Sequence, residues 1–459
     1  MTSDATSKIA AIILAAGKGT RMKSALPKVM HAVAGRAMVL HVLDAAKALG
    51  AERAVVVVGP DMPEVGAAVK PFETAVQQRQ LGTADAVNAA RKALGDFRGT
   101  VFILYGDTPL ITPATLRHML AEREKTKPMA AVVALGFRPA DPGAYGRLVV
   151  DRAGALTGIV EAKDATPAQI KIDLCNSGVM AVDGAALWAL LDKVGNDNAK
   201  GEFYLTDIVG LARKQKLRCA YVEAPESELQ GVNDRVDLAQ AEAALQDRLR
   251  RTAMAAGVTM TDPSSVFLAW DTRLGSDVVI GPNVVFGPGV TVHDRVEIRA
   301  FCHLEGAEIG ADAIIGPFAR LRPGTKLGAK VHIGNFVECK AALLGEGAKA
   351  NHLAYVGDAE IGAKTNVGAG TITANYDGFF KHKTIVGKGV SIGSNAVLVA
   401  PVRIGDGVLI GAGSTIAKDI DVDALAVTRA ELKIVPGAAK RYRERKTAEK
   451  AAKAKAKDR

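Results

Sequence analysis

The chain has 459 residues, enough for two or three domains, and its 48% hydrophobic and 24% charged residues are those of an ordinary globular protein. The net charge of +10 does not by itself indicate a nucleic-acid-binding protein. Residues 436–459 hold ten Lys/Arg against three Asp/Glu, so most of the excess lies in one tail. Four cysteines that lie far apart, with no CxxC pair, exclude a disulfide-rich scaffold and favour a reducing cytoplasm.

The first predicted element is the apolar run at residues 9–16, which leads directly into the loop GKGTRMKSALPKVMH at 17–31. The run could be the core of a signal peptide, but a buried first strand is favoured, and no run is long enough to span a membrane. Small residues let backbone N–H groups approach a phosphate and the cations neutralise it, so the loop predicts a phosphate site. A dinucleotide fingerprint is excluded by Met22, which replaces the third glycine, and no GxxxxGK[ST] string exists.

Further strand-like runs follow at residues 54–59, 100–107 and 130–137. Each is rich in aliphatic residues and too short for a helix, which predicts buried strands. Strands that alternate with helices form a mostly parallel sheet that binds ligands at the carboxyl ends of its strands. Asp107 ends one run and is therefore a candidate ligand for Mg²⁺, which prefers oxygen donors. The alternative is an Asp that only forms the turn before Thr108-Pro109.

Helical segments lie between these strands and after them. One ends at Gly50 as its C-cap, a second begins with Thr83 as its N-cap, and a third has Thr112 as N-cap before Pro113. Residues 234–256 contain no Gly or Pro and are rich in Ala, Leu, Gln and Arg. They predict a long helix that connects two domains.

Beyond residue 257 an aliphatic or aromatic residue recurs at every sixth position. The positions are Ile280, Phe286, Val292, Ile298 and Leu304, then, after one step of five, Ile309, Ile315, Leu321, Leu327 and Ile333, and later Val386, Ile392, Leu398, Ile404, Ile410 and Ile416. This period is typical of hexapeptide repeats that wind a parallel β-helix, with one inward residue per hexapeptide and roughly seven coils. The period fails at residues 373–385, which predict a loop extruded from the coils, and the basic tail after residue 435 is expected to be solvated or disordered.

The string LxxGxGTRM at residues 14–22, with Leu26-Pro27-Lys28 after it, resembles the sugar-phosphate nucleotidylyltransferase family. Other landmarks of that family follow in order: QQRQLGTADA (77–86), YGDTPL (105–110), AYGRLV (144–149), GIVEAKDA (158–165), CNSGVM (175–180) and QGVNDR (230–235). With the hexapeptide half included, nearly the whole chain is similar to a family of bacterial bifunctional enzymes, the N-acetylglucosamine-1-phosphate uridylyltransferase/glucosamine-1-phosphate N-acetyltransferases. Only the tail has no counterpart in this resemblance.

The resemblance implies an α/β architecture in four parts. These are a Rossmann-like nucleotidyltransferase domain (1–232), a linker helix (233–256), a left-handed parallel β-helix of hexapeptide repeats with the N-acetyltransferase site (257–435), and the tail (436–459). It also implies a cytoplasmic homotrimer with acetyl-transfer sites between neighbouring β-helices, which takes small-molecule substrates and needs neither nucleic acid nor a membrane. Its product, UDP-N-acetylglucosamine, would supply peptidoglycan and lipopolysaccharide synthesis.

For uridylyl transfer, the resemblance implies that a phosphate oxygen of N-acetylglucosamine-1-phosphate attacks the α-phosphorus of UTP, with Mg²⁺ bound and pyrophosphate leaving. Arg21 and Lys28 would hold phosphates, although either could be a surface charge. Asp107 and Asn233 would hold the metal, although Asn233 could simply cap the linker helix. The nucleotide and sugar would contact Leu14, Ala15, Ala16, Gly17, Lys28, Gln77, Gly82, Thr83, Tyr105, Gly106, Gly146, Glu161 and Asn176.

Acetyl transfer from acetyl-CoA needs a base near neutrality, because the amine of glucosamine-1-phosphate must lose a proton. Of the histidines in the repeat half (His293, His303, His332, His352 and His382), the resemblance singles out His352 as the base, and Glu338 is a hypothetical orienting carboxylate. The implied sugar-phosphate ligands are Arg322, Lys340, Tyr355 and Asn366. The implied acetyl-CoA ligands are Ala369, Asn375, Tyr376, Ser394, Ala412 and Arg429, each of which could otherwise be an ordinary loop or repeat residue.

Two other functions stay open at this point. A nucleotidylyltransferase with a single activity could use the β-helix only for assembly or regulation, and a non-catalytic scaffold could retain both folds. The cluster of Arg322, Lys340, His352 and Tyr355 disfavours the first alternative. The loop of Arg21 and Lys28 together with Asp107 disfavours the second.

Overall fold

The computed structural model describes residues 8–457, with side chains to residue 453, and the chain divides into two compact units, Met1–Thr291 and Val292–Arg459. The first unit is built on a nine-stranded sheet in the order β11-β7-β10-β6-β1-β4-β5, with β8 paired to β10 and β9 paired to β8. Along that order neighbouring strands are parallel except at β10, which runs antiparallel to β6 and β7, and the added strands β8 and β9 are also antiparallel. The predicted first strand and the mostly parallel sheet are therefore confirmed. The strands are β1 (Ile9–Leu14), β4 (Arg53–Val58), β5 (Glu73–Val76), β6 (Thr100–Tyr105), β7 (Val132–Phe137), β8 (Arg147–Val150), β9 (Leu156–Val160), β10 (Cys175–Asp183) and β11 (Cys219–Glu223), with a separate pair β2 (Ala32–Val33) and β3 (Arg36–Ala37).

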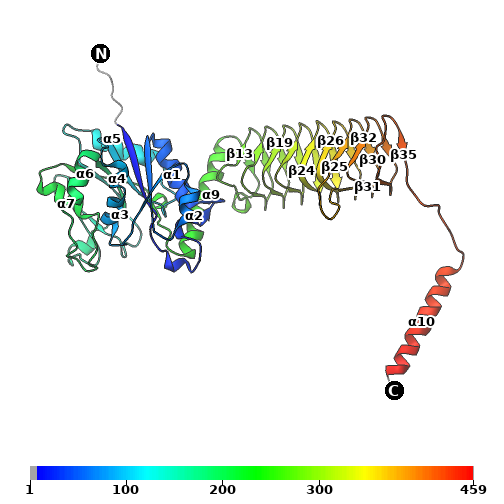
Figure 1. The fold of residues 1–459 in the computed structure, drawn as a ribbon, viewed down its shortest axis with the longest axis horizontal. Coiled ribbons are helices and arrows are strands. Elements are labelled where there is room, and N and C mark those ends of the chain that lie inside the picture. The colour runs from blue at the N-terminus through cyan, green and yellow to red at the C-terminus, as the bar shows by residue number, and fades with distance from the viewer. Residues whose placement is uncertain (1–7, 458–459) are drawn as a thin grey trace, which may run out of the picture. The chain divides into compact units, whose positions relative to one another are not determined.

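Helices cover both faces of this sheet, as Figure 1 shows. Helices α1 and α5 bury Val42 and Leu116 against one face, and α3 and α6 bury Val87 and Leu187 against the other. Strands that are covered on both sides need continuous apolar runs, which explains why the sequence shows no alternation there. The helices of this part are α1 (Met38–Leu49), α2 (Pro63–Ala68), α3 (Thr83–Ala89), α4 (Arg91–Leu94), α5 (Pro113–Glu124), α6 (Gly184–Leu191), α7 (Asp207–Lys214) and α8 (Glu226–Leu229).

The predicted caps are confirmed at two helices and wrong at a third. Gly50 ends α1 with a φ of 96°, and the Thr112 hydroxyl accepts a hydrogen bond from the Thr115 amide at 3.2 Å. Thr83 is instead the first residue of α3, and Gly82 is the N-cap. The Thr83 hydroxyl is already used, because it accepts a hydrogen bond from the Leu205 amide at 2.9 Å.

The connecting helix is α9 (Arg235–Ala255), begun by Asp234, whose carboxylate accepts from the amides of Val236 and Asp237. Gln246, in this helix, is buried and exchanges two hydrogen bonds with the backbone of Leu268. Contacts of this kind place residues 257–291 in the first unit, and those residues include β12 (Thr259–Met260), β13 (Arg273–Leu274), β14 (Val279–Ile280) and β15 (Val285–Phe286). The boundaries at residues 232 and 256 follow sequence patterns and stay a prediction.

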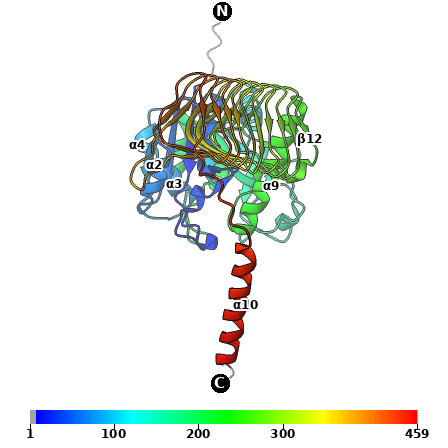
Figure 2. The same cartoon turned by 90° about the vertical axis from the view of Figure 1, so that its right-hand side faces the viewer.

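The second unit is a stack of coils made of short parallel strands, seen end-on in Figure 2. One sheet runs β17 (Glu297–Ile298), β20 (Ile314–Ile315), β23 (His332–Asn335), β25 (Lys349–His352), β27 (Asn366–Val367), β30 (Ser391–Ile392), β33 (Leu409–Ile410), β35 (Leu425–Ala426). Another contains β19 (Ala307–Ile309), β22 (Thr325–Leu327), β24 (Glu338–Leu344), β26 (Tyr355–Ile361), β28 (Ile372–Ala374), β31 (Val397–Val399) and β34 (Thr415–Ile416), with β18 (His303–Leu304), β21 (Arg320–Leu321), β29 (Thr384–Val386) and β32 (Val402–Ile404) paired to it. β16 (Thr291–Val292) crosses the boundary between the units.

The hexapeptide period is confirmed by burial, since all sixteen predicted inward residues are at most 4% exposed. A glycine follows many of these inward residues, because at that position the backbone of the next coil lies too close to leave room for a side chain. A Cβ on Gly345, for example, would lie 2.6 Å from the Ala363 nitrogen. An extruded loop is present, but it is shorter than the predicted 373–385: β26 pairs with both β28 and β29, and only residues 375–383 leave the coil between them.

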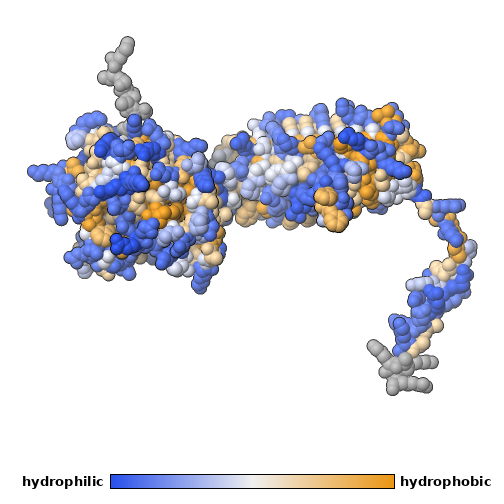
Figure 3. All heavy atoms as spheres, viewed as in Figure 1, coloured by the Kyte–Doolittle hydropathy of each residue, from blue (hydrophilic) through white to orange (hydrophobic). Residues whose placement is uncertain are grey.

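The tail differs from the prediction. It was expected to be solvated or disordered, but it forms helix α10 (Ala438–Lys457), which is mostly hydrophilic in Figure 3. Ala, Lys, Arg and Glu are strong helix formers, and Lys440–Glu444 is one of several ion pairs at helical spacing. Its described side chains beyond Ala438 are exposed, so the expected solvation is met. Within the described residues, no helix is long and apolar enough to cross a membrane.

Candidate active sites

A cavity of about 380 Å³ lies where β1, β5 and β6 end, at the carboxyl edge of the sheet. Ten of the predicted nucleotide-site residues line it: Leu14, Ala15, Ala16, Gly17, Lys28, Gln77, Gly82, Thr83, Tyr105 and Asp107. The structure therefore brings together residues from four separate sequence motifs. Gly106 supports the same edge, because its amide donates to the Leu14 carbonyl at 2.9 Å.

An ion pair in this cavity joins Lys28 to Asp107. The Lys28 Nζ lies 2.5 Å from Asp107 Oδ2, and the two side chains are 13% and 20% exposed. Gly19 permits this placement, since a Cβ there would lie 2.5 Å from the Lys28 Cβ and its φ is +60°. The glycine-rich loop thus folds back onto itself and carries an ammonium group over the end of β6.

Gln77 is a buried amide at the wall of the cavity. Its Nε2 donates to the Gly82 carbonyl at 3.2 Å and to Asp85 Oδ2 at 2.8 Å. The amide oxygen is therefore the atom that Gln77 can offer to a ligand, as an acceptor. Gly82 must be a glycine here, because its φ is +124° and a Cβ would lie 2.5 Å from the Phe203 oxygen.

Asp107 and Asn233 come together through the backbone. The amide of Val232 donates to the Asp107 carbonyl at 2.9 Å, and Asn233 is the next residue. The Asn233 amide nitrogen donates to the Gly231 carbonyl at 3.1 Å, which leaves its oxygen for a cation. A carboxylate and an amide oxygen fit Mg²⁺, which binds one or two protein oxygens and keeps several waters. Within the described residues, no group of three or more His, Cys, Asp or Glu side chains could hold a metal.

The predicted sugar ligands form a cluster beside this cavity. A Cβ on Gly146 would lie 3.4 Å from Glu161 Oε1, and the Asn176 amide donates to the Gly146 carbonyl at 2.8 Å. Burial raises the pKa of Glu161 above its ordinary value, and a hydrogen bond from Thr206 opposes this. Burial also raises the pKa of Tyr105, and the nearby charges of Asp107 and Glu161 add to the shift. Tyr105 is therefore close to both Asp107 and Glu161.

Arg21 is not among the side chains that line the cavity within the described part of the chain. It is exposed in the short 3₁₀ helix Thr20–Met22, which follows Gly19 in the same loop. Its role in holding phosphate stays a prediction that depends on ligand binding.

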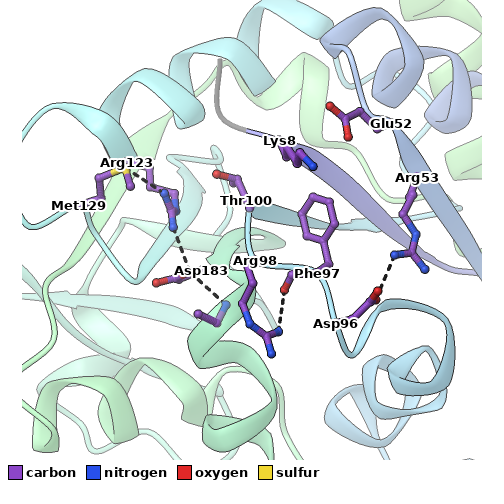
Figure 4. A pocket seen from close by; sticks show the side chains of 12 residues that line it. Lys8, Glu52, Arg53, Asp96, Phe97, Arg98, Thr100, Arg123, Met129 and Asp183 are labelled. Atoms are coloured by element: carbon purple, nitrogen blue, oxygen red, sulfur yellow. Dashed lines mark hydrogen bonds and ion pairs between the residues drawn. The ribbon is translucent and has the colours of Figure 1, made fainter. Parts of the chain in front are cut away.

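A larger cavity, of about 850 Å³, lies at the opposite, amino edge of the sheet (Figure 4). Its arginines already have partners: Arg53 pairs with Asp96 at 3.1 Å and Arg123 with Asp183 at 3.4 Å. Arg98 donates to backbone carbonyls. These internal pairs leave little positive charge for a nucleotide, so size alone does not make this cavity the active site.

In the second unit, the predicted sugar-phosphate ligands Arg322, Lys340 and Tyr355 lie on adjacent coils. The Arg322 amide donates to the Cys339 carbonyl at 2.8 Å, which places Arg322 and Lys340 at equivalent positions. A Cβ on Gly357, the residue paired with Lys340, would lie 2.3 Å from the Tyr355 hydroxyl. The tyrosine ring therefore covers Gly357, the neighbour of Lys340 on the next coil.

Lys381 joins this cluster, although it was not among the predicted ligands. Its pKa lies below the ordinary value, chiefly because the neighbouring Lys340 ammonium group disfavours a second positive charge. Two ammonium groups that repel each other would both be stabilised by an anion between them. The insertion 373–385 was the available signal, since loops of this kind often form binding faces.

His352 lines a separate cavity of about 300 Å³ together with His332, Asn335 and Asn351. Its Nδ1 lies 2.9 Å from Asn335 Oδ1. The hypothesis that Glu338 orients His352 is wrong for this chain, because Glu338 pairs with Arg322 at 2.8 Å and the ring is held by Asn335. Asn366 pairs in register with Lys349, on the same sheet as His352.

The predicted acetyl-CoA ligands fall into two groups. Ala369, Ser394 and Ala412 lie in successive coils near one corner, where the Asn395 amide donates to the Ala369 carbonyl and the Gly413 amide to the Ser394 carbonyl. Arg429 approaches the same corner, with its Nη2 3.4 Å from the position of a Cβ on Gly411. Asn375 and Tyr376 belong to the extruded loop, where Asn375 donates to Asp358.

Comparisons with known proteins cover both units. Residues 11–170 match the MobA-like NTP transferase domain, and residues 271–306, 306–341 and 383–418 match the bacterial transferase hexapeptide family (six repeats), in agreement with a left-handed β-helix. A "Bifunctional protein GlmU" from Paramagnetospirillum magneticum is 58% identical over 449 residues, 98% of this chain and 100% of that protein. Proteins of the same name from Rhodospirillum rubrum and Azorhizobium caulinodans are 59% and 53% identical, over 95% and 93% of this chain and 97% and 95% of theirs.

Proposed function

This chain belongs to the family of bifunctional GlmU proteins, and from that membership we propose two separate active sites, one in each unit. The enzyme acetylates glucosamine-1-phosphate with acetyl-CoA and transfers the uridylyl group of UTP to N-acetylglucosamine-1-phosphate. Its product supplies cell-wall synthesis. The match along 98% of the chain carries this conclusion, because it includes both halves and so supports two activities over a single-activity enzyme or a scaffold.

We place uridylyl transfer in the cavity of about 380 Å³ at the carboxyl edge of the sheet. Backbone groups of residues 14–17 and the Lys28 ammonium would bind the phosphates, and the Gln77 amide oxygen would accept a hydrogen bond from the uracil N–H. A phosphate oxygen of the sugar phosphate forms the new bond to the α-phosphorus, and the bond to pyrophosphate breaks. The nucleophile is already an anion and needs no base, so the main task of the site is to offset negative charge.

We propose that Asp107 and Asn233 hold Mg²⁺ when UTP binds. The ion would add positive charge at the phosphates that Lys28 alone cannot supply. The free oxygen of Asn233 supports this assignment. Arg21, exposed in the same loop as Lys28, would reach the phosphates from the open side.

We place acetyl transfer in the second unit. Arg322, Lys340 and Lys381 would bind the phosphate of glucosamine-1-phosphate, with Tyr355 beside them. The amine attacks the thioester carbon and His352 takes the amine proton. The C–S bond then breaks, and the same proton passes from His352 to the sulfur, so that coenzyme A leaves as the thiol. Acetyl-CoA would lie along Ala369, Ser394, Ala412 and Arg429, with Asn375 and Tyr376 contributed by the loop, and Asn366 would contact the sugar.

We propose that the protein assembles as a homotrimer in the cytoplasm. An exposed ladder of stacked rings supports assembly: Phe301, Phe318 and Phe336 are 45–56% exposed, with centroids 5.0 and 5.1 Å apart. Apolar surface of this kind is better covered by another copy. All four cysteines are free and buried, as expected in a reducing compartment. Native mass spectrometry would reveal three chains per particle, and a monomer would contradict the proposal.

One reaction mixture tests the assignment of both activities. Purified protein is incubated with glucosamine-1-phosphate, acetyl-CoA, UTP and Mg²⁺, and the products are identified by mass spectrometry. UDP-N-acetylglucosamine is expected only when acetyl-CoA is present. If N-acetylglucosamine-1-phosphate has to be supplied instead, the acetyl-transfer site proposed above is inactive.

A further inference from the structure

We propose that Asn335 is a positioning residue for acetyl transfer, which holds the His352 imidazole in the tautomer that carries its proton on Nδ1. This leaves Nε2 as the nitrogen that accepts the proton of the attacking amine. The proposal rests on the role of His352 as the base. It is carried by the contact of 2.9 Å between His352 Nδ1 and Asn335 Oδ1.

The backbone fixes this contact. Asn335 ends β23 and His352 ends β25, and the two residues are paired in the parallel register of these strands. The amide of Leu353, the residue after His352, donates to the Asn335 carbonyl at 3.0 Å. Gly334 allows the strands to approach, since a Cβ there would lie only 2.0 Å from the Asn351 carbonyl oxygen. The two side chains are therefore brought together by consecutive coils and not by flexible loops.

The chemistry of the amide selects the tautomer. An amide oxygen can only accept a hydrogen bond, so the ring nitrogen that faces it must carry the hydrogen. The other nitrogen then keeps its lone pair. The same bond persists when the ring is doubly protonated, and a neutral amide stabilises the imidazolium less than a carboxylate would.

The charged surroundings do not offer an alternative partner. His332 lies on β23 in the same cavity, and its pKa is lowered by burial and by the cations Arg299 and Lys349. Glu297 is the acid near His332, and it accepts a hydrogen bond from Arg299 at 2.9 Å. On the other side, β27 contributes Asn366 and Val367, which carry no charge. Among these groups, Asn335 is the one bonded to the His352 ring.

The test combines spectroscopy with kinetics. In full-length protein labelled with ¹⁵N-histidine, the ring shifts of His352 are expected to be those of the Nδ1–H tautomer, identified by their loss in His352→Ala. Asn335→Leu removes the acceptor and is expected to mix the tautomers. It should lower kcat of acetyl transfer at least tenfold with little change in KM for glucosamine-1-phosphate, because a general base contributes about 10²–10⁴-fold.

Asn335→Asp keeps the acceptor and adds a charge. It is expected to retain the Nδ1–H tautomer and activity at high pH, while the acidic limb of the pH–rate profile moves upward by about one unit. Asn351→Leu, which alters the same cavity without a bond to the ring, should leave the tautomer unchanged. Uridylyl transfer, measured in every variant, reports on folding.

Two results would overturn the proposal: an Nε2–H tautomer in the wild type, or an Asn335→Leu enzyme whose tautomer and kcat are both unchanged. Failure of the proposed base is recognised separately. In that case His352→Ala retains acetyl transfer, whatever tautomer the ring adopts.

Discussion

Replacing Lys28 by Met should separate metal binding from catalysis at the uridylyl site. If Asp107 is a metal ligand, the Lys28 ammonium at 2.5 Å competes with a cation for Oδ2 in the free enzyme. A hydrogen bond between charged groups contributes about 1.5–3 kcal/mol, and the lower end applies here because both side chains are partly exposed. Since about 1.4 kcal/mol corresponds to a factor of ten, Lys28→Met should bind Mn²⁺ roughly tenfold more tightly in the absence of nucleotide.

Catalysis should change in the opposite direction. Loss of one preorganised cation at the developing charge is expected to lower uridylyl transfer by about 10²–10³-fold, while acetyl transfer in the second unit stays unchanged. Mn²⁺ binding is measured by electron paramagnetic resonance and the rate by pyrophosphate release. Lys18→Met, an exposed lysine in the same loop, is the matched control and should alter neither quantity. Unchanged Mn²⁺ affinity in Lys28→Met would refute the reasoning that Asp107 is a metal ligand masked by Lys28.

Three further variants probe other parts of the molecule. Gly82→Ala should destabilise the protein by more than about 1 kcal/mol and weaken UTP binding, because the φ of Gly82 is +124° and a Cβ would meet the Phe203 oxygen. The control Gly66→Ala lies in α2 with open space around the new Cβ, so it should raise the temperature of thermal unfolding. Burial raises the pKa of Glu161 in the folded protein. The contribution of Glu161 to the free energy of unfolding is therefore fully present below pH 4.5, the pKa of an ordinary glutamate, and is lost as the pH rises through the pKa of the folded protein. Glu161→Gln should therefore unfold at a higher temperature than the wild type at neutral pH, with the difference vanishing in acid. Truncation after Gly437 should leave both activities and the unfolding temperature unchanged, because the described side chains of α10 beyond Ala438 are exposed; a loss of either would indicate that the tail has a structural role.

Sequence patterns correctly predicted those parts of the protein in which the position of each residue follows from its near neighbours in the chain. The hexapeptide period identifies inward residues such as Ile315 and Ile392 because every coil places its sixth residue in the same environment. The glycine-rich loop and Asp107 were recognisable because strands of a parallel sheet deliver their carboxyl ends to one edge. In both cases, short-range geometry determines the position.

Residues that act across coils were harder to identify. Asn335 meets His352 because they lie 17 residues apart, one full coil, and without the exact coil length an isolated asparagine is unremarkable. Lys381 reaches Lys340 through a loop whose path no local rule determines. Thr83 was assigned as a cap because its type suits that position, but a contact with Leu205 uses its hydroxyl. The tail, which lacks apolar residues for a core, still forms a helix through intrinsic propensity alone.

The central claim, two independent active sites on one chain, is tested most directly by analysing the products of two single variants. Asp107→Asn and His352→Ala are each incubated with glucosamine-1-phosphate, acetyl-CoA, UTP and Mg²⁺, alone and mixed, and the products are resolved by mass spectrometry. We expect Asp107→Asn to accumulate N-acetylglucosamine-1-phosphate, His352→Ala to leave glucosamine-1-phosphate unconverted, and the mixture to make UDP-N-acetylglucosamine. If either folded variant lost both activities or retained both, the division into two sites would be contradicted.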